Sequence, residues 1–276
     1  MKERPVPRPF ATVVFAVTLV IVLNVCAGAQ AAPPKSIPIL ERDSPNQLTS
    51  SERGKGWTLL FDGHSGAGWR GAKSEEFPSR GWSTDNGVLM IREASTFELR
   101  AGGDLLSIEQ YGDFIFDFEF ALSEGANSGV KYRARPQTQW GFVHSLGCEY
   151  QILDDERHPD AKAGAAGNRK LASLYDLLPT DRDRREEDPF RGVGVWNHGR
   201  IHLEEKQIAH YLNGVRVLSV TIDSPPWKTA LSESKFADRE AFCAGPLGHL
   251  VLQDHGNEVR FRNLRILSLD VQDDGS

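Results

Sequence analysis

The residues from Gly147 to Asp176 combine side chains that could bind a polar ligand and move its protons. Glu149 and Gln151 stand two apart in a strand pattern, so their side chains share one face. A loop follows that adds more carboxylates and the imidazole of His158. Carboxylates and imidazoles act as general acids and bases, and both also bind divalent metal ions. A charged surface loop beside a half-solvated strand would have the same composition, so the functional interpretation depends on other segments.

Three other segments place polar side chains on strands that otherwise alternate with core residues. They are residues 127–133, 196–202 and 253–255. If these strands lie together in one sheet, their polar side chains converge on a concave face of the kind that holds sugars. We therefore expect one pocket to be lined by Arg133, Glu149, Gln151, His158, Gln253 and His255.

The sequence contains none of the common catalytic motifs. It has no G-x-S-x-G elbow, no H-E-x-x-H, no P-loop and no G-x-G-x-x-G after a strand. A glycoside hydrolase of the β-sandwich type needs two carboxylates across the scissile bond. On the Glu149 strand the second position on that face is Gln151, which cannot transfer a catalytic proton. Ordinary two-carboxylate hydrolysis on this strand is therefore disfavoured.

Short strands separated by turn residues dominate from Trp57 onward. Residues 111–122 alternate, with four phenylalanines at positions 114, 116, 118 and 120 on one face and a mostly polar face opposite. Asn86-Gly87 and Asn213-Gly214 predict hairpin turns, the second within a three-strand meander over 200–222. Helical periodicity is weak, with one short turn expected at 171–178. This pattern predicts an all-β sandwich of the jelly-roll kind.

Residues 1–31 have the features of a signal peptide. Three basic residues precede an apolar run over 10–25, and small residues follow at Ala29-Gln30-Ala31. A retained anchor is the alternative, but the run is short for a span of about 20 residues. We expect export to the periplasm or the extracellular space, with no membrane attachment after cleavage. Removal of this segment moves the net charge from −6 to about −8, so nucleic acid is a poor candidate partner.

The remainder of the chain predicts a single large domain. Residues 32–53 are rich in proline, serine and charge and are expected to form a flexible linker, with the β-sandwich domain over 54–270. The two cysteines of the domain, Cys148 and Cys243, could pair in an oxidising compartment or remain as two buried thiols.

Five motifs occur in order between residues 54 and 269 and together resemble one family. They are GWTLLFDGHSGAGWRG, NSGVKYRA, EYQILDDERHPDAKAGAAGNRKLASLYDL, WNHGRIHLEEKQIAHYLNG and LQDHGNEVRFRNLRI. The family is the former domain-of-unknown-function family now described as 3-keto-disaccharide hydrolases, with a concanavalin A-like jelly-roll fold. The sequence departs from the family only near the start, where His64–Trp69 replaces the usual D-L-x-G-W turn.

The resemblance implies cleavage of 3-keto-glycosides, which are carbohydrate substrates already oxidised at C3. A C3 ketone acidifies the C2 proton, so a base can remove it and expel the C1 substituent without a carboxylate nucleophile. We expect the catalytic residues to be Glu149, His158 and His255, with His158 or His255 as the base. A divalent metal ion held by Glu149 and His158 would polarise the ketone. We expect substrate contacts from Arg133, Gln151, Asp154, Tyr175, Asn197 and Gln253.

Two other function classes fit the same fold. One is a carbohydrate-binding module without catalysis, which would use exposed aromatic platforms such as Trp69, Trp140 and Trp196. The other is an ordinary glucanase. A titratable cluster around one concave site would favour the enzyme over the binding module.

Overall fold

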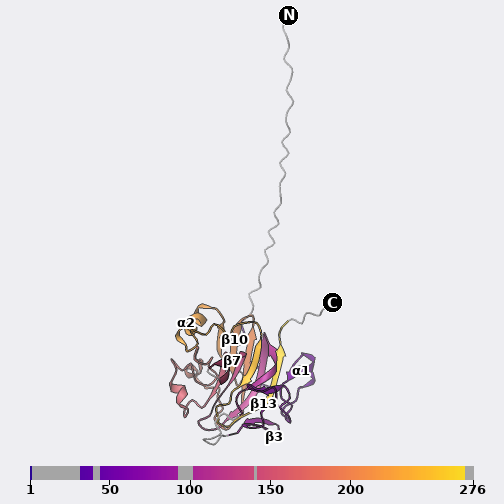
Figure 1. Cartoon of the computed structure of the whole chain (residues 1–276). Coiled ribbons are helices and arrows are strands. Elements are labelled where there is room, and N and C mark those ends of the chain that lie inside the picture. The colour runs from indigo at the N-terminus through magenta and orange to yellow at the C-terminus, as the bar shows by residue number, and fades with distance from the viewer. Residues whose placement is uncertain (2–31, 40–43, 93–101, 140–141, 271–276) are drawn as a thin grey trace. The chain divides into compact units, whose positions relative to one another are not determined.

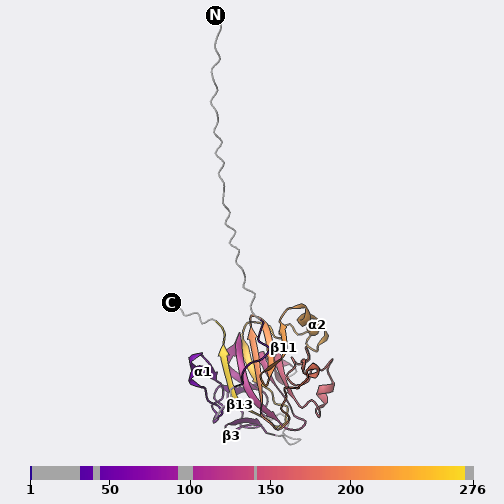
Figure 2. The same ribbon diagram turned by 180° about the vertical axis from the view of Figure 1, so that it is seen from behind.

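The computed structural model describes residues 1, 32–39, 44–92, 102–139 and 142–270, which hold two antiparallel sheets packed face to face (Figures 1 and 2). The eight-stranded sheet has the spatial order β11 (Val215–Thr221), β10 (Gln207–Leu212), β9 (Asn197–Glu204), β6 (Phe114–Leu122), β13 (Val259–Ser268), β4 (Val88–Ile91) and β3 (Trp82–Asp85), and β1 (Thr58–Leu59) pairs with β13. The five-stranded sheet has the order β2 (Trp69–Gly71), β5 (Leu105–Tyr111), β12 (Gly248–Leu252), β7 (Asn127–Gln139) and β8 (Phe142–Leu153). The predicted jelly-roll sandwich of the concanavalin A-like class is confirmed.

In the described part of the chain, helices are few and lie at the margins of the sandwich. The α-helices are α1 (Ser50–Gly54) and α2 (Pro225–Glu233), and single 3₁₀ turns cover Pro159–Lys162 and Arg182–Arg184. The short turn expected at 171–178 is present as a single turn in which Leu178 N donates to Leu174 O at 3.0 Å. The same segment also hydrogen-bonds to the edge of β8, with Ala172 N donating to Gln151 O at 2.8 Å and Gln151 N donating to Ser173 O at 3.2 Å. Helix α2, which Ser224 caps at its N-terminus, was not predicted from the sequence.

The core between the sheets is built on the phenylalanine row of β6. Phe114, Phe116, Phe118 and Phe120 are all fully buried, as the alternation predicts. Phe118 packs edge-on against Tyr150 of the opposite sheet, with ring centroids 5.3 Å apart. The two predicted hairpin turns are also present, and Asn86 and Asn213 adopt the positive φ values of 48° and 47° that such turns require.

The opposite face of β6 is less solvated than its polar residues suggest. Asp117 is fully buried and accepts hydrogen bonds from Arg200 at 2.5 and 2.7 Å and from Arg265 at 2.9 Å. Arg265 in turn lies 3.3 Å from Glu52 of α1. The outer face of the larger sheet is therefore closed by a buried ion-pair network that also holds the N-terminal helix.

The described residues of 32–53 do not behave as the flexible linker that we expected. Asn46 and Asn263 exchange two hydrogen bonds of 2.6 and 2.8 Å, and Thr49 forms a capping box with Glu52 at the start of α1. Ser36 forms an isolated bridge to Val215 of the edge strand β11. The described part of this segment from Pro33 onward thus belongs to the same compact unit as the sandwich.

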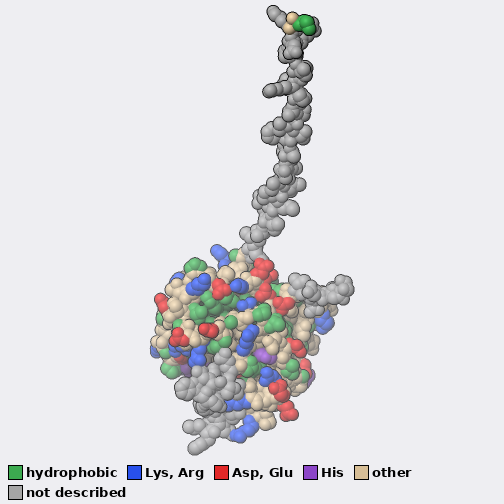
Figure 3. Space-filling model, turned by 45° about the horizontal axis from the view of Figure 1, so that its top comes forward, with side chains coloured by type: hydrophobic (Ala, Val, Ile, Leu, Met, Phe, Trp, Pro, Cys, Tyr) green, Lys and Arg blue, Asp and Glu red, His purple; other side chains and the backbone are tan. Residues whose placement is uncertain are grey.

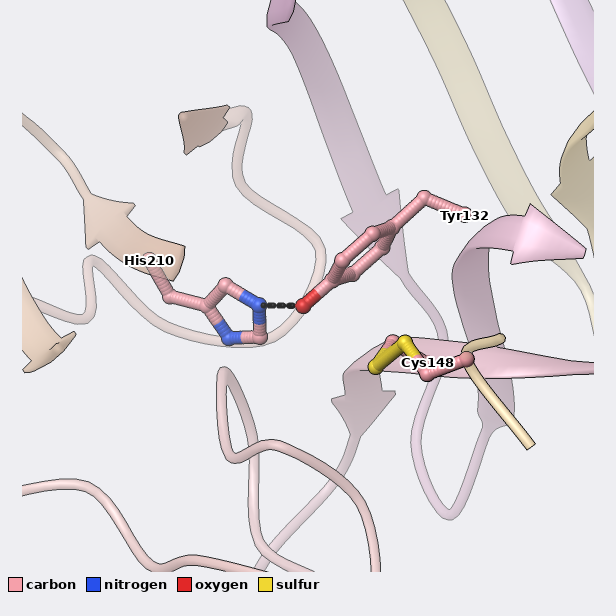
Figure 4. Close-up of a disulfide and its surroundings, with 4 residues drawn as sticks. Tyr132, Cys148 and His210 are labelled. Atoms are coloured by element: carbon pink, nitrogen blue, oxygen red, sulfur yellow. Dashed lines mark hydrogen bonds between the residues drawn. A yellow bond between two sulfur atoms is a disulfide. The ribbon is translucent and has the colours of Figure 1, made fainter. Parts of the chain in front are cut away.

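A disulfide joins Cys148 of β8 to Cys243, with their Cα atoms 5.4 Å apart (Figure 4). Of the two alternatives for these cysteines, the structure has the paired form. The nearby Tyr132 hydroxyl lies 2.9 Å from His210 Nε2, and this contact links the two sheets within the core (Figure 4). Burial lowers the pKa of His210 to about 4, so this histidine is neutral at physiological pH.

The predicted signal peptide covers residues 1–31, of which 2–31 lie outside the described residues. No helix in the described part of the chain is long and apolar enough to cross a membrane. On the face drawn in Figure 3, acidic and basic side chains are interspersed among polar and apolar ones.

Candidate functional site

The candidate site lies on the outer face of the five-stranded sheet, where β7 and β8 are neighbours. In their register Lys131 stands opposite Glu149, and Gly129 stands opposite Gln151. The intervening residues of both strands, such as Val130 and Tyr150, are buried in the core between the sheets. Alternation therefore turns Lys131, Glu149 and Gln151 away from the core. On this outer face a cavity of about 420 Å³ lies over them.

Five parts of the chain build the cavity. Strands β7 and β8 form its floor, residues 253–255 extend it beyond the end of β12, and two loops supply its walls. Its lining comprises Asn127, Lys131, Leu146, Glu149, Gln151, Tyr175, Lys235, Phe236, Arg239, Gln253 and His255.

Glu149 is the central titratable side chain of the cavity. It is 6% exposed, and its Oε2 lies 3.9 Å from Lys131 Nζ. Burial raises the pKa of Glu149 to about 7, although the nearby cations Lys131 and Lys235 oppose the shift. A carboxyl group with this pKa exchanges its proton near neutral pH, which is the property of an effective general acid or base.

Gly129 creates the space in which the polar groups of the floor meet. A Cβ at this position would overlap Gln253 Oε1 and would lie 2.7 Å from Glu149 Oε1. Both oxygens therefore converge above the glycine. The buried Oε1 atoms of Gln151 and Gln253 have no hydrogen-bond partner among the described residues. Unpaired buried acceptors are costly, so this floor is suited to a ligand that donates several hydrogen bonds, such as a sugar.

Tyr175 forms one wall beside Glu149. Its backbone N–H donates to Glu149 O at 3.1 Å, which fixes the segment against β8, and its hydroxyl donates to Asp160 at 2.9 Å. Lys235 Nζ lies 4.2 Å from the centre of the Tyr175 ring, while the Lys235 backbone N–H donates to Asp176 at 2.9 Å. The ammonium of Lys235 is thus held over an aromatic face at the edge of the cavity.

A family model described as "3-keto-alpha-glucoside-1,2-lyase-like domain" matches residues 56–267, which include the whole candidate site. The chain belongs to this family. A relative from Bacteroides thetaiotaomicron, described as a 3-keto-disaccharide hydrolase, is 32% identical over 256 residues. That alignment covers 86% of this chain and 85% of the relative.

Two solved structures from Parabacteroides distasonis, each described as a candidate glycosyl hydrolase, share the fold. The first is 26% identical with a TM-score of 0.69, covering 82% of this chain and 100% of the other. The second is 24% identical with a TM-score of 0.50, covering 73% of this chain and 99% of the other, and it supports the fold alone. The family match, the Bacteroides thetaiotaomicron relative and the first of these two structures together support the assignment of this protein as a carbohydrate hydrolase.

The structure brings together five of the residues that the sequence analysis selected for the site. Glu149, Gln151, Tyr175, Gln253 and His255 all line the cavity. Glu149 and Gln151 come from one strand, and Gln253 and His255 follow the end of β12, which pairs with β7. Four of the five therefore come from β8 or from the end of β12, the two strands that flank β7 in one sheet.

The prediction that Arg133 shares this pocket is wrong. The register of β7 against β8 shifts between Tyr132 and Arg135, and Arg133 sits in this bulge with a φ of 48°. A bulge breaks the alternation of side chains, so a residue two positions after Lys131 no longer shares its face. Arg133 instead lines a separate hollow near Trp227.

Three other predicted residues are used elsewhere. His158 caps the 3₁₀ turn at Pro159–Lys162, where its Nδ1 accepts from Asp160 N at 3.2 Å, and it is not part of the cavity lining. The Asp154 carboxylate accepts from three backbone N–H groups, the shortest being Gly125 N at 2.7 Å. Asn197 lies on β9 of the other sheet, where it hydrogen-bonds to Arg191, Asn213 and nearby carbonyls. The last two residues stabilise turns and do not reach the cavity.

The predicted metal pair does not fit the structure. Glu149 lines the cavity while His158 does not, and the ammonium of Lys131 lies beside the Glu149 carboxylate. Among the described residues, no group of three or more His, Cys, Asp and Glu side chains is arranged to hold a metal ion. We therefore derive no step through a metal held by this pair.

Sequence reasoning missed the basic residues of the cavity. Lys131 could have been found, because it stands directly opposite Glu149 once the two strands are paired. Lys235 and Arg239 carried no such signal, since they lie between α2 and Cys243 in a segment without strand or helix periodicity. The disulfide from Cys243 to Cys148, next to Glu149 in the sequence, holds this segment near the site.

Of the three tryptophans that could serve as platforms in a binding module, the two that the structure describes, Trp69 and Trp196, do not present an open ring face. Trp69 is 2% exposed, and its indole N–H donates to Leu60 O within the fold. Trp196 is covered by the guanidinium of Arg262, 4.2 Å from its ring. Trp140 lies outside the described residues.

Proposed function

We propose that this protein cleaves the glycosidic bond of carbohydrates that carry a ketone at C3, with Glu149 as the general base. The observation that carries the proposal is the buried carboxyl group of Glu149. It lies in a cavity lined by amide and cationic side chains, and its pKa is raised to about 7. The family and the name of the Bacteroides thetaiotaomicron relative support the substrate class.

The proposed reaction is a β-elimination. The Glu149 carboxylate removes the C2 proton, the electrons form an enolate with the C3 ketone, and the enolate then expels the C1 oxygen with its substituent. The leaving oxygen receives a proton, and His255 supplies the imidazole that lines the cavity as its candidate donor. Addition of water to the resulting enone then completes a net hydrolysis.

The cations of the cavity support the enolate intermediate. Lys131 and Lys235 both lie near Glu149, and positive charge in a partly desolvated site stabilises developing negative charge. The unpaired amide oxygens of Gln151 and Gln253 would accept hydrogen bonds from the sugar hydroxyls. The floor thus orients the ring while the walls stabilise the charge.

The number of carboxylates that line the cavity favours elimination over ordinary glucanase chemistry. Among the cavity-lining residues that the structure describes, Glu149 is the single carboxylate. Retaining and inverting glycosidases use two carboxyl groups about 5 to 10 Å apart, one of them as nucleophile or base and the other as acid. A reaction with one base and an activated C2 proton needs no second carboxylate.

The test compares a 3-keto-glucoside with its unoxidised parent. We expect the wild-type protein to cleave only the oxidised sugar, and Glu149→Gln to lower kcat by about 100-fold or more. Equal cleavage of the two sugars, or of neither, would contradict the proposed function. Binding of both sugars without turnover would instead support the binding-module alternative.

We also propose that residues 1–31 direct export and are then removed. The basic start, apolar run and small residues near Ala31 support this proposal. Mass spectrometry of the exported protein should find a new N-terminus near Gln30 or Ala32. Recovery of Met1 in a membrane fraction would contradict it.

A further inference from the structure

A second hollow adjoins the cavity through a shared wall residue. It measures about 840 Å³ and is lined by residues of the β7 bulge, of α2 and of the segment that ends at Pro246. Arg239 belongs to the lining of both spaces. A ligand with two parts could therefore place one part over Glu149 and the other in this hollow.

Arg133 is held in an unusual backbone conformation at the wall of this hollow. Its φ of 48° is rare for a residue other than glycine, and the bulge directs its side chain away from the Glu149 cavity. Gly248 of β12 makes room for the bulge, because a Cβ there would overlap the Arg133 backbone. Strained residues kept at a hollow are often functional.

The guanidinium of Arg133 is incompletely paired. The residue is 8% exposed, and its Nε has no hydrogen-bond partner among the described residues. Its ion pair with Asp113 is long, at 3.9 Å, and the second Asp113 oxygen already accepts from Glu205 N at 2.6 Å. An arginine left in this state is suited to an incoming hydrogen-bond acceptor.

The charges of the hollow indicate the chemical class of the ligand. Its lining carries the cations Arg133, Lys206 and Arg239 and the anions Asp223, Asp238 and Glu240. A free anion gains little where the charges balance, whereas a neutral polyol can donate to carboxylates and accept from guanidinium groups. The apolar side chains of Leu231 and Pro246 add contact area.

We propose that this hollow binds the leaving sugar of a disaccharide substrate, with Arg133 as the residue that recognises it. The inference rests on the proposed function, because it places the oxidised ring over Glu149 and the second ring beyond Arg239. Arg133 is a specificity-determining residue, since it contacts the leaving group and not the reacting C2 proton.

The test measures binding of unoxidised sugars by calorimetry, so it requires no turnover. The probes are methyl α-glucoside, which has one ring, and the two-ring sugars trehalose, maltose and kojibiose. We expect the wild-type protein to bind at least one disaccharide about tenfold more tightly than methyl α-glucoside, as one or two charge-assisted hydrogen bonds would give.

Arg133→Ala should abolish this preference while affinity for methyl α-glucoside stays unchanged. Arg133→Lys keeps the charge but not the planar fork, so it should lose most of the preference for the disaccharide. This variant provides the test if Arg133→Ala fails to fold. Arg260→Ala, which removes an arginine whose side chain is 50% exposed and paired with Glu258, is the matched control and should bind both ligands normally.

Two results would overturn the inference. One is a wild-type protein that binds no disaccharide more tightly than methyl α-glucoside. The other is an equal loss of affinity for both ligand classes in the Arg133 variants. If the protein binds a disaccharide more tightly than methyl α-glucoside but cleaves no 3-keto sugar, the proposed reaction is contradicted and the proposed binding site is not.

Discussion

Replacement of Glu149 by glutamine should stabilise the protein at neutral and alkaline pH while removing its activity. The pKa of this carboxyl group rises from 4.5 to about 7 in the folded state, chiefly through burial. Between these values the folded protein binds more protons than the unfolded chain, so stability falls as pH rises. Above pH 7 the ionised group remains a destabilising buried charge.

The magnitude follows from the size of the pKa change. One pKa unit corresponds to about 1.4 kcal/mol, so the rise of the Glu149 pKa from 4.5 to about 7 is equivalent to about 3 kcal/mol of lost stability. Glu149→Gln removes the titration and keeps the shape. The free energy of unfolding of the variant should therefore match that of the wild type near pH 4 and exceed it by up to about 3 kcal/mol at pH 8.

Urea denaturation followed by tryptophan fluorescence, at intervals from pH 4 to pH 8, measures this difference. Glu124→Gln is the control, because the Glu124 side chain is 70% exposed and lies outside the cavity lining. Its difference from the wild type should not vary over this range. A Glu149→Gln difference that is also independent of pH would refute the assignment of a strongly raised pKa.

Three further predictions test the fold and the floor of the cavity. Phe116→Ala should lower the free energy of unfolding by about 3 to 5 kcal/mol in denaturant titrations, because it empties a fully buried site in the phenylalanine row, and a loss below about 1 kcal/mol would contradict the described core. Gly129→Ala should leave the fold intact but reduce activity at least tenfold, since its methyl group would displace Gln253 and Glu149, and unchanged kcat/KM would argue against this floor. Replacing Cys148 and Cys243 together by alanine should lower stability by about 4 to 5 kcal/mol, as expected for a crosslink spanning 95 residues, and an unchanged melting temperature would contradict that value.

Much of the fold follows from local sequence patterns. The period of two in 114–120 identifies the core face of β6, and the Asn-Gly pairs locate two hairpin turns, because both signals act over a few residues. The floor of the site follows for the same reason, since Glu149 and Gln151 share a face of one strand. Pairing of β12 with β7 then brings Gln253 close to them.

Features that depend on distant residues or on backbone irregularities could not be predicted in this way. The bulge at Arg133 has no local signature, because a positive φ at arginine contradicts its intrinsic preference. Asp117 has the sequence pattern of a solvent-facing residue, and its burial depends on Arg200 and Arg265, which lie 83 and 148 residues away. The position of Lys235 likewise depends on a disulfide whose pairing the sequence left open.

The most direct test of the central claim uses a 3-keto-glucoside labelled with deuterium at C2. If Glu149 removes the C2 proton, cleavage should show a primary kinetic isotope effect, the label should appear in the solvent, and both should be absent in Glu149→Gln. Cleavage at the same rate for labelled and unlabelled sugar, with the deuterium retained at C2 of the product, would contradict the account.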